Sequence, residues 1–277
     1  MSRSWIITGC STGIGRAIAS HVLAIGDQAA VTARRPSDVA DIVAAHPDRA
    51  IALPLDVSDP AQVKTAVAET EARFGKIDLL VNNAGYGYVA SIEEGDEAAI
   101  KAMYETNFFG ALRMMQAVLP GMRARRSGRI IQISSLAGRI SNPATGHYSG
   151  TKFALEAVSE ALSREVEALG IRVCSIAAGM FRTDFSGRSL HTGQSAVSDY
   201  DAGVHERMKL VQSVDGKQPG DPMKLARIVE AVADMADPPR QLIAGPDAYR
   251  AICARMDEVR AAMTAHEALS IDTHFDT

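Results

Sequence analysis

The chain has 277 residues, of which 47% are hydrophobic and 22% are charged, and its formal net charge is −4. This composition excludes wholesale disorder, and the small negative charge provides no field that would attract nucleic acid. The length fits one large α/β domain better than two small ones. We therefore expect a single domain over residues 1–277 with no nucleic-acid partner.

The cysteines give no sign of a disulfide framework or a metal site. Cys10, Cys174 and Cys253 are far apart and show neither CxxC nor histidine-rich spacing. The chain enters an apolar strand near its start, which leaves no room for a signal peptide, and no apolar stretch reaches membrane-spanning length. We expect a cytoplasmic protein with no membrane partner and no bound metal.

The first predicted element is a short strand, Trp5–Thr8, followed by a glycine turn and a helical pattern. Glycines in such a turn permit close approach of a pyrophosphate, and the helix N-terminus offers it free N–H groups. The spacing is GxxxGxG rather than GxGxxG, so a purely structural turn stays an alternative. The candidate cofactor contacts are Gly9, Ser11, Thr12, Gly13, Ile14 and Gly15.

The second strand, Ala29–Ala33, ends in Arg34 and Arg35. In dinucleotide-binding folds, an acidic residue at this strand end accepts a hydrogen bond from the ribose 2′-hydroxyl of NAD. Ala33 occupies that position here, while the two arginines offer charge-assisted bonds to a 2′-phosphate. We therefore predict NADP(H) as cofactor, with NAD(H) as the alternative. A further alternative is that one arginine merely lies on the surface.

The next two strands also end in candidate cofactor contacts. A strand over Ala50–Leu55 precedes an aspartate suited to the exocyclic amine of adenine, and the strand Ile77–Val81 runs into an NNAG motif. In that motif, side-chain amides are expected to tie neighbouring strands together, and the glycine lets a cofactor pass closely. The candidates are Asp56, Val57, Asn83, Ala84 and Gly85.

The middle of the chain continues the alternation of helix and strand. Two helices are predicted, near Asp96–Tyr104 and through Leu112–Leu119, with Asn107 between them. The strand Arg129–Ser134, a long helix to about Leu169 and the strand Ile171–Ala177 follow. This order predicts an α/β fold, a Rossmann-type doubly wound parallel sheet of about seven strands with helices on both faces.

Tyr148 and Lys152 stand four residues apart at the start of the long helix. On one helix face, an ammonium can lie beside the phenol and lower its pKa, which is about 10 in a free tyrosine. Ser135, at the end of the preceding strand, could hold a substrate oxygen against that phenol. For an isolated YxxxK pattern, a surface tyrosine and a solvated lysine are the more common outcome.

Together these motifs resemble those of the short-chain dehydrogenase/reductase family, over about residues 4–250: Thr8–Gly15, Asn82–Gly85, Asn107, Ser135 and Tyr148–Lys152. The resemblance implies that Tyr148 is the acid-base catalyst and that Lys152 lowers its pKa and holds the nicotinamide ribose. It also implies that Ser135 orients the substrate oxygen, with Ser134 as its rival, and that Asn107 maintains a water chain.

The resemblance further implies an NADP(H)-dependent oxidoreductase that interconverts a ketone or aldehyde and an alcohol. An apolar substrate and a homodimer or homotetramer are expected. Two alternatives stay open: a non-catalytic NADP-binding regulator or scaffold, and a lyase or epimerase on the same fold. Where the family usually has Pro-Gly, this chain has Ala178-Gly179, which loosens a turn expected to bind the cofactor carboxamide through Gly179, Phe181 and Thr183.

Two segments near the C-terminus are expected to shape specificity. A substrate lid without a clear strand period is predicted over 184–221. Apolar residues in and just before this segment could wall a pocket, although simple packing is the more common role at such spacing: Met180, Phe185, Leu190, Tyr200, Met208 and Leu210. A helical extension over about 246–270 resembles that of relatives of 17β-hydroxysteroid dehydrogenases. It is expected either to cover the pocket or to alter subunit contacts.

Overall fold

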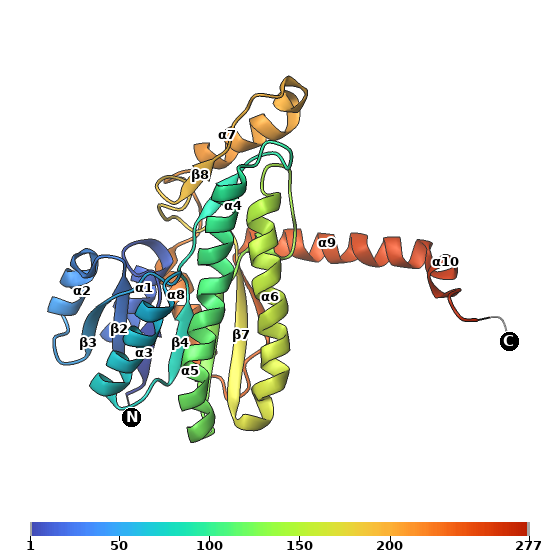
Figure 1. Ribbon diagram of the computed structural model, residues 1–277. Helices are drawn as coiled ribbons and strands as arrows, with labels where there is room; N and C mark the ends of the chain where they lie inside the picture. Colours follow the sequence, from blue (N-terminus) through green and yellow to red (C-terminus); the bar gives the residue numbers. More distant parts are fainter. Residues whose placement is uncertain (1, 276–277) are drawn as a thin grey trace.

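The computed structural model describes residues 2–275 and is built on a seven-stranded parallel sheet with helices on both faces (Figure 1). The strand order is β3-β2-β1-β4-β6-β7-β9. This confirms the predicted doubly wound Rossmann-type sheet. The strands are β1 (Ser4–Ile7), β2 (Gln28–Ala33), β3 (Ala50–Pro54), β4 (Leu79–Asn82), β6 (Gly128–Ile133), β7 (Ile171–Ala178) and β9 (Gln241–Ala244).

Alternating side chains on the strands build a separate apolar core on each face of the sheet. In β1, Trp5 and Ile7 belong to the core under α1 and α8, whereas Ile6 belongs to the core under α3, α5 and α6. No helix within residues 2–275 is both long and apolar enough to cross a membrane. The helices flanking the sheet are α1 (Gly13–Ala24), α2 (Ala40–Ala44), α3 (Pro60–Phe74), α4 (Glu97–Tyr104), α5 (Ala111–Arg125), α6 (Gly146–Val166) and α8 (Pro222–Asp234).

The direction of winding reverses between β1 and β4. From β1 the chain winds outwards through β2 to β3 and then returns to form β4 on the other side of β1. The backbone N–H of Thr8 donates to the carbonyl of Val81 over 3.0 Å, which joins the two strand ends. In open α/β sheets, ligands bind beyond the carboxyl ends of the strands at such a reversal.

The two helices predicted on either side of Asn107 run into each other. Both predicted helices are present, and a π-helical turn, Glu105–Gly110, joins α4 to α5 without an intervening loop. No proline interrupts this turn, and a β-carbon at Gly110 would lie 2.5 Å from Cγ2 of Val57. The π-helical turn has more residues than an α-helical turn, so the helix continues through it. Such turns are frequent at functional sites.

A second sheet joins two segments that are far apart in the sequence. β5 (Gly87–Val89) pairs in parallel with β8 (Leu190–Thr192). Sequence patterning predicts neither strand, because three residues are too few to show an alternation. The segment Asp184–Asp221 therefore contains a strand as well as α7 (Glu206–Ser213).

α9 (Pro246–Ala265) and α10 (Glu267–Ile271) form an arm that projects from the body (Figure 1). Ala248 and Ile252 pack against the body, whereas Met256 is 62% exposed and Met263 is 69% exposed. No arm residue within 2–275 lines the large cavity at the strand ends. Of the two roles considered for this extension, covering the pocket is therefore not seen in this chain.

Candidate active site

A cavity of about 1220 Å³ contains nearly all the residues predicted to bind cofactor or to catalyse. Of the predicted residues, Gly15 and Asn107 do not line the cavity, and both are buried behind the residues that do. The predicted residues that line it are Gly9, Ser11, Thr12, Gly13, Ile14, Arg34, Arg35, Asp56, Val57, Asn83, Ala84, Gly85, Ser135, Tyr148, Lys152, Gly179, Phe181 and Thr183.

The glycine turn after β1 leaves the N-terminus of α1 open to the cavity. Gly9 and Gly13 have φ values of 72° and 61°, which favour glycine. A β-carbon at Gly15 would lie 2.4 Å from the carbonyl oxygen of Gly9, so Gly15 serves packing behind the turn. The Thr12 side chain does not cap α1, and the first turn holds no acidic residue. The free N–H groups therefore fit the diphosphate of a dinucleotide.

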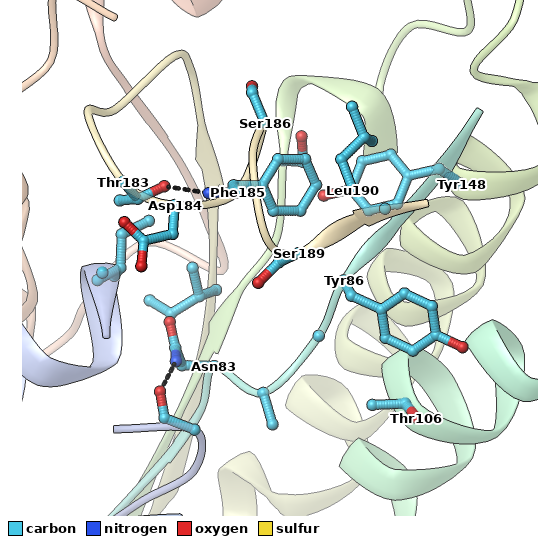
Figure 2. A pocket seen from close by; sticks show the side chains of 18 of the residues that line it. Asn83, Tyr86, Thr106, Tyr148, Thr183, Asp184, Phe185, Ser186, Ser189 and Leu190 are labelled. Carbon is cyan, nitrogen blue, oxygen red and sulfur yellow. Dashed lines mark hydrogen bonds between the residues drawn. The ribbon is translucent and has the colours of Figure 1, made fainter. Parts of the chain in front are cut away.

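The NNAG motif ties the ends of β1 and β4 together, as predicted. Nδ2 of Asn83 donates to the carbonyls of Thr8 and Gly9 over 2.9 and 3.0 Å (Figure 2). In return, Oγ1 of Thr8 accepts from the backbone N–H groups of Asn83 and Ala84 over 2.9 and 3.0 Å. These bonds fix the floor on which a cofactor would lie.

The two arginines after β2 are not equivalent. Arg35 is 76% exposed and pairs with Asp38 over 3.2 Å. Burial raises the pKa of Tyr86, and the charge of Arg34 partly offsets this rise. Both arginines are exposed and line the cavity, but Arg34 has no ion pair among residues 2–275. Further along the wall, Oδ1 of Asp56 accepts from the N–H and hydroxyl of Ser58 over 2.9 and 2.6 Å.

Ser135, Tyr148 and Lys152 meet where β6 ends and α6 begins. Lys152 is buried, and its Nζ donates to the carbonyl of Ile133 over 3.0 Å and lies 6.0 Å from the centroid of the Tyr148 ring. Oγ of Ser135 accepts from the N–H of Ala137 over 3.1 Å, so its hydroxyl proton can be donated to Tyr148 or to an oxygen atom in the cavity. This group can hold and protonate an oxygen atom.

The predicted lowering of the Tyr148 pKa is wrong for this geometry. Burial raises the pKa of Tyr148 to about 12, and hydrogen bonding with Ser135 only partly opposes it. Burial also lowers the pKa of Lys152 to about 8, against the opposing charge of Glu156. Because Nζ of Lys152 is directed to the Ile133 carbonyl, it gives no direct support to a phenolate.

Asn107 lies in the π-helical turn and uses its whole amide on neighbouring groups. Its Nδ2 donates to the carbonyl of Tyr86 over 2.8 Å and to Oγ1 of Thr151 over 3.2 Å. Its Oδ1 accepts from the N–H of Tyr86 over 3.0 Å. Asn107 thus fixes the backbone that leads into β5. Its suggested role in a water chain stays a prediction.

The turn after β7 is held by contacts that sequence reasoning missed. The N–H of Gly179 donates to the carbonyl of Ala244, and the N–H of Met180 donates to Oδ2 of Asp247, each over 2.8 Å. These bonds offset the loosening expected from Ala178 in place of proline. Beyond the turn, a β-carbon at Gly13 would lie 3.2 Å from Cβ of Thr183, so this segment closes on the glycine turn.

The segment Asp184–Asp221 lies over Tyr148. The rings of Phe185 and Tyr148 are 5.5 Å apart with an interplanar angle of 54°, and Leu190 lies beside them (Figure 2). Met180, Phe185, Leu190 and Leu210 line the cavity as predicted, whereas Tyr200 and Met208 do not. Met208 instead packs in a small core with Val89 and Ala144.

Polar contacts that the sequence patterns did not show attach this segment to the body. Nη2 of Arg188 donates to Oγ1 of Thr12 over 3.0 Å. His205 is buried and contacts Glu94 and Asp201, each over 2.8 Å. Thr12 and Glu94 are far in the sequence from the residues that they contact, so no spacing marks those pairs, whereas the i,i+4 spacing of Asp201 and His205 is a signal that could have been found.

Comparison with known proteins agrees with this geometry. The model of the short chain dehydrogenase family matches residues 3–193. A 3-ketodihydrosphingosine reductase of Bacteroides thetaiotaomicron is 34% identical over 244 residues, which is 87% of each protein.

Two solved structures share the fold. A short-chain dehydrogenase from Streptomyces avermitilis is 40% identical, with a TM-score of 0.93 over 99% of this chain and 100% of its own. An alcohol dehydrogenase from Thermococcus sibiricus, complexed with 5-hydroxy-NADP, is 25% identical, with a TM-score of 0.71 over 88% of this chain and 96% of its own. This chain therefore belongs to the short-chain dehydrogenase family and is an oxidoreductase of that type.

Proposed function

We propose that the protein is an NADP(H)-dependent oxidoreductase that interconverts a ketone or aldehyde and the corresponding alcohol. The observation that carries the proposal is the convergence of Ser135, Tyr148 and Lys152 in the cavity onto which the uncapped N-terminus of α1 opens. Two of the similar proteins support it, since one is named a reductase of a keto compound and the other an alcohol dehydrogenase.

Tyr148 is the proton donor and acceptor in this proposal. When bound, the nicotinamide supplies or accepts the hydride. During reduction, Tyr148 gives its phenolic proton to the carbonyl oxygen, and during oxidation it takes that proton back. A pKa of about 12 keeps the phenol protonated at neutral pH, which suits reduction. Ser135 donates its hydroxyl proton to the same oxygen, and Lys152 holds a positive charge below pH 8 or so.

The segment Asp184–Asp221 acts as a lid over an apolar substrate. Phe185 and Leu190 lie against Tyr148, and Val89, Leu210 and further apolar side chains line the same end of the cavity. An apolar wall of this kind favours a carbon chain or ring beside the reacting carbonyl.

The test of the catalytic proposal is the Tyr148→Phe variant. We expect it to lose at least about 10³-fold in kcat for ketone reduction, because no other group replaces the proton donor, while the Kd for NADPH changes little. Tyr249→Phe is the matched control, because Tyr249 is 60% exposed on α9. Retention of most activity by Tyr148→Phe would contradict the assignment.

The same assay separates the two alternative functions. A panel of ketones and alcohols is followed through NADPH absorbance with the wild-type protein. Complete silence across the panel with intact NADPH binding would favour a regulator or scaffold. Product formation without net consumption of cofactor would favour a lyase or epimerase.

The preference for NADP(H) rests on Arg34, which lines the cavity, and on Ala33 in place of an acidic residue. Arg34→Asp should weaken NADPH binding by about 10- to 100-fold through loss of charge-assisted bonds, with little effect on NADH. Arg35→Asp should have a smaller effect, because Arg35 is already paired with Asp38. Direct titration of each cofactor measures the difference, and an equal effect of Arg34→Asp on both cofactors would defeat the preference.

A further inference from the structure

One cation that lines the cavity has no counter-charge from the chain. Arg207 lies in α7 and lines the cavity, and its Nε is buried without a hydrogen-bond partner among residues 2–275. Two residues earlier, His205 contacts the carboxylates of both Glu94 and Asp201. Those two acids are thus engaged by the histidine, and Arg207 forms no ion pair within the described part of the chain.

The carboxylates that line the cavity are also engaged elsewhere. Asp38 pairs with Arg35, Glu105 with Arg113, Asp184 with Arg188, and Asp56 accepts from Ser58. A guanidinium that is partly withdrawn from water is stabilised by an anion or by hydrogen-bond acceptors. Since the lining of the cavity offers Arg207 no free carboxylate, an anion that enters the cavity can pair with it.

Packing places Arg207 at the substrate end of the cavity rather than at the adenosine end. The adjacent Met208 packs against Val89 of β5 and against Ala144, which lies just before the helix that carries Tyr148. α7 and β8 lie together at one end of the molecule (Figure 1). Arg34, by contrast, follows β2 on the far side of β1 from Tyr148.

We propose that Arg207 binds a carboxylate of the substrate, so that the enzyme acts on oxo acids and hydroxy acids. The substrate then has an apolar body, a carbonyl at Tyr148 and a carboxylate remote from that carbonyl. A planar carboxylate matches the two-pronged geometry of a guanidinium. This inference rests on the proposed oxidoreductase function and names the class of its substrate.

The first experiment compares medium-chain oxo acids with their methyl esters. We expect wild-type kcat/KM to favour the acid by about 10- to 100-fold, because only the acid forms charge-assisted bonds with Arg207. Arg207→Gln should bring the ratio of acid to ester close to one, and Arg207→Lys should restore part of it. Lys209→Gln is the matched control, because it removes an exposed cation from the same helix and should keep the wild-type ratio.

The second experiment measures binding without turnover. Saturated medium-chain carboxylates and the corresponding primary amides are titrated calorimetrically into the wild-type protein and both Arg207 variants, with and without NADP. We expect the carboxylate to bind the wild type at least about 10-fold more tightly than the amide and to lose this advantage in Arg207→Gln. Circular dichroism checks that the variants fold.

The two experiments distinguish failure of the inference from failure of the proposed function. If the wild type does not bind the carboxylate more tightly than the amide, the Arg207 inference is overturned, whether or not ketones are reduced. If carboxylate selectivity depends on Arg207 but no ketone or alcohol is turned over, the proposed reaction fails and the anion site stands.

Discussion

The floor of the site and the lid above it are held by different kinds of contact. Ser135, Tyr148 and Lys152 stand on β6 and α6, whose apolar side chains are buried in the body. The segment Asp184–Asp221 is attached through the pairing of β5 with β8, the polar contacts of Arg188 and His205, and only a small apolar core around Met208. Elements with few buried contacts open at a low cost in free energy, whereas a packed floor moves only with the core.

This difference separates chemistry from specificity. A proton donor and an orienting hydroxyl require fixed positions, which a strand end and a packed helix provide. In the proposed function, substrate choice is assigned to side chains such as Phe185 and Arg207, which belong to the lid and line the cavity. Changes on the floor should therefore alter kcat strongly, and changes in the lid should mainly alter KM.

After Tyr148→Phe, the next largest effect is expected from Ser135→Ala on the floor. Loss of its donated hydrogen bond should lower kcat for ketone reduction by about 10²- to 10³-fold, with unchanged NADPH binding. Ser134→Ala is the matched control, because Oγ of Ser134 is buried and has no hydrogen-bond partner among residues 2–275. Steady-state kinetics on both variants checks the assignment. A greater loss in Ser134→Ala would transfer the role to Ser134.

The two directions of the reaction are expected to depend differently on pH. Because burial raises the pKa of Tyr148 to about 12, the phenol stays protonated through neutral pH and kcat/KM for ketone reduction should not depend on its titration. Alcohol oxidation needs the phenolate, so its kcat/KM should rise by up to about tenfold per pH unit. A plateau of the oxidation profile near neutral pH would show that the cofactor-bound enzyme has a much lower tyrosine pKa.

A smaller effect is expected from His205→Gln in the lid. This change weakens the contacts with Glu94 and Asp201, so KM should rise by about 3- to 10-fold while kcat changes little. Tyr200→Phe removes an exposed hydrogen bond to Glu93 and should have less effect. Limited proteolysis within residues 184–221 reports opening of the lid independently. If both KM and the cleavage rate stay unchanged, His205 does not help to attach the lid.

The same contacts make attachment of the lid depend on pH. Hydrogen bonds with Glu94 and Asp201 raise the pKa of His205 above its ordinary 6.5, so this stabilisation is complete below pH 6.5 and is lost as the pH rises through the raised value. Hydrogen bonding with His205 lowers the pKa of Glu94 from 4.5 to about 2, so its contribution is lost as the pH falls through that range. Amide protection factors over residues 196–214, which correct for the pH dependence of intrinsic exchange, should be highest between these limits, and His205→Gln should flatten their fall above pH 6.5.

The smallest effect is expected from removal of residues 266–277 at the end of the arm. α10 has no buried residue, so kcat and KM should stay unchanged and Tm should move by less than about 2 °C. Thermal unfolding at several protein concentrations checks this. A larger fall that depends on concentration would show that the arm is buried between subunits of the expected homodimer or homotetramer.

The sequence by itself determined the sheet, the glycine turn and the shared helix face of Tyr148 and Lys152. These features depend on local periodicity and on short-range spacing, which can be observed directly in the sequence. The tie between Asn83 and Thr8 was also predictable, because parallel strands end at the same edge of a sheet.

Tertiary structure alone decided the electrostatics and the long-range contacts. The rise of the Tyr148 pKa results from burial, and the Lys152 ammonium is directed away to the Ile133 carbonyl. The four-residue spacing of Tyr148 and Lys152 predicts neither feature. The pairing of β5 with β8 and the bond from Asp247 to the turn after Ala178 each join residues that are far apart in the chain. The lack of a partner for Nε of Arg207 depends on which residues surround it in the folded protein. Local patterns cannot encode such partners, because the folded core alone brings them within contact distance.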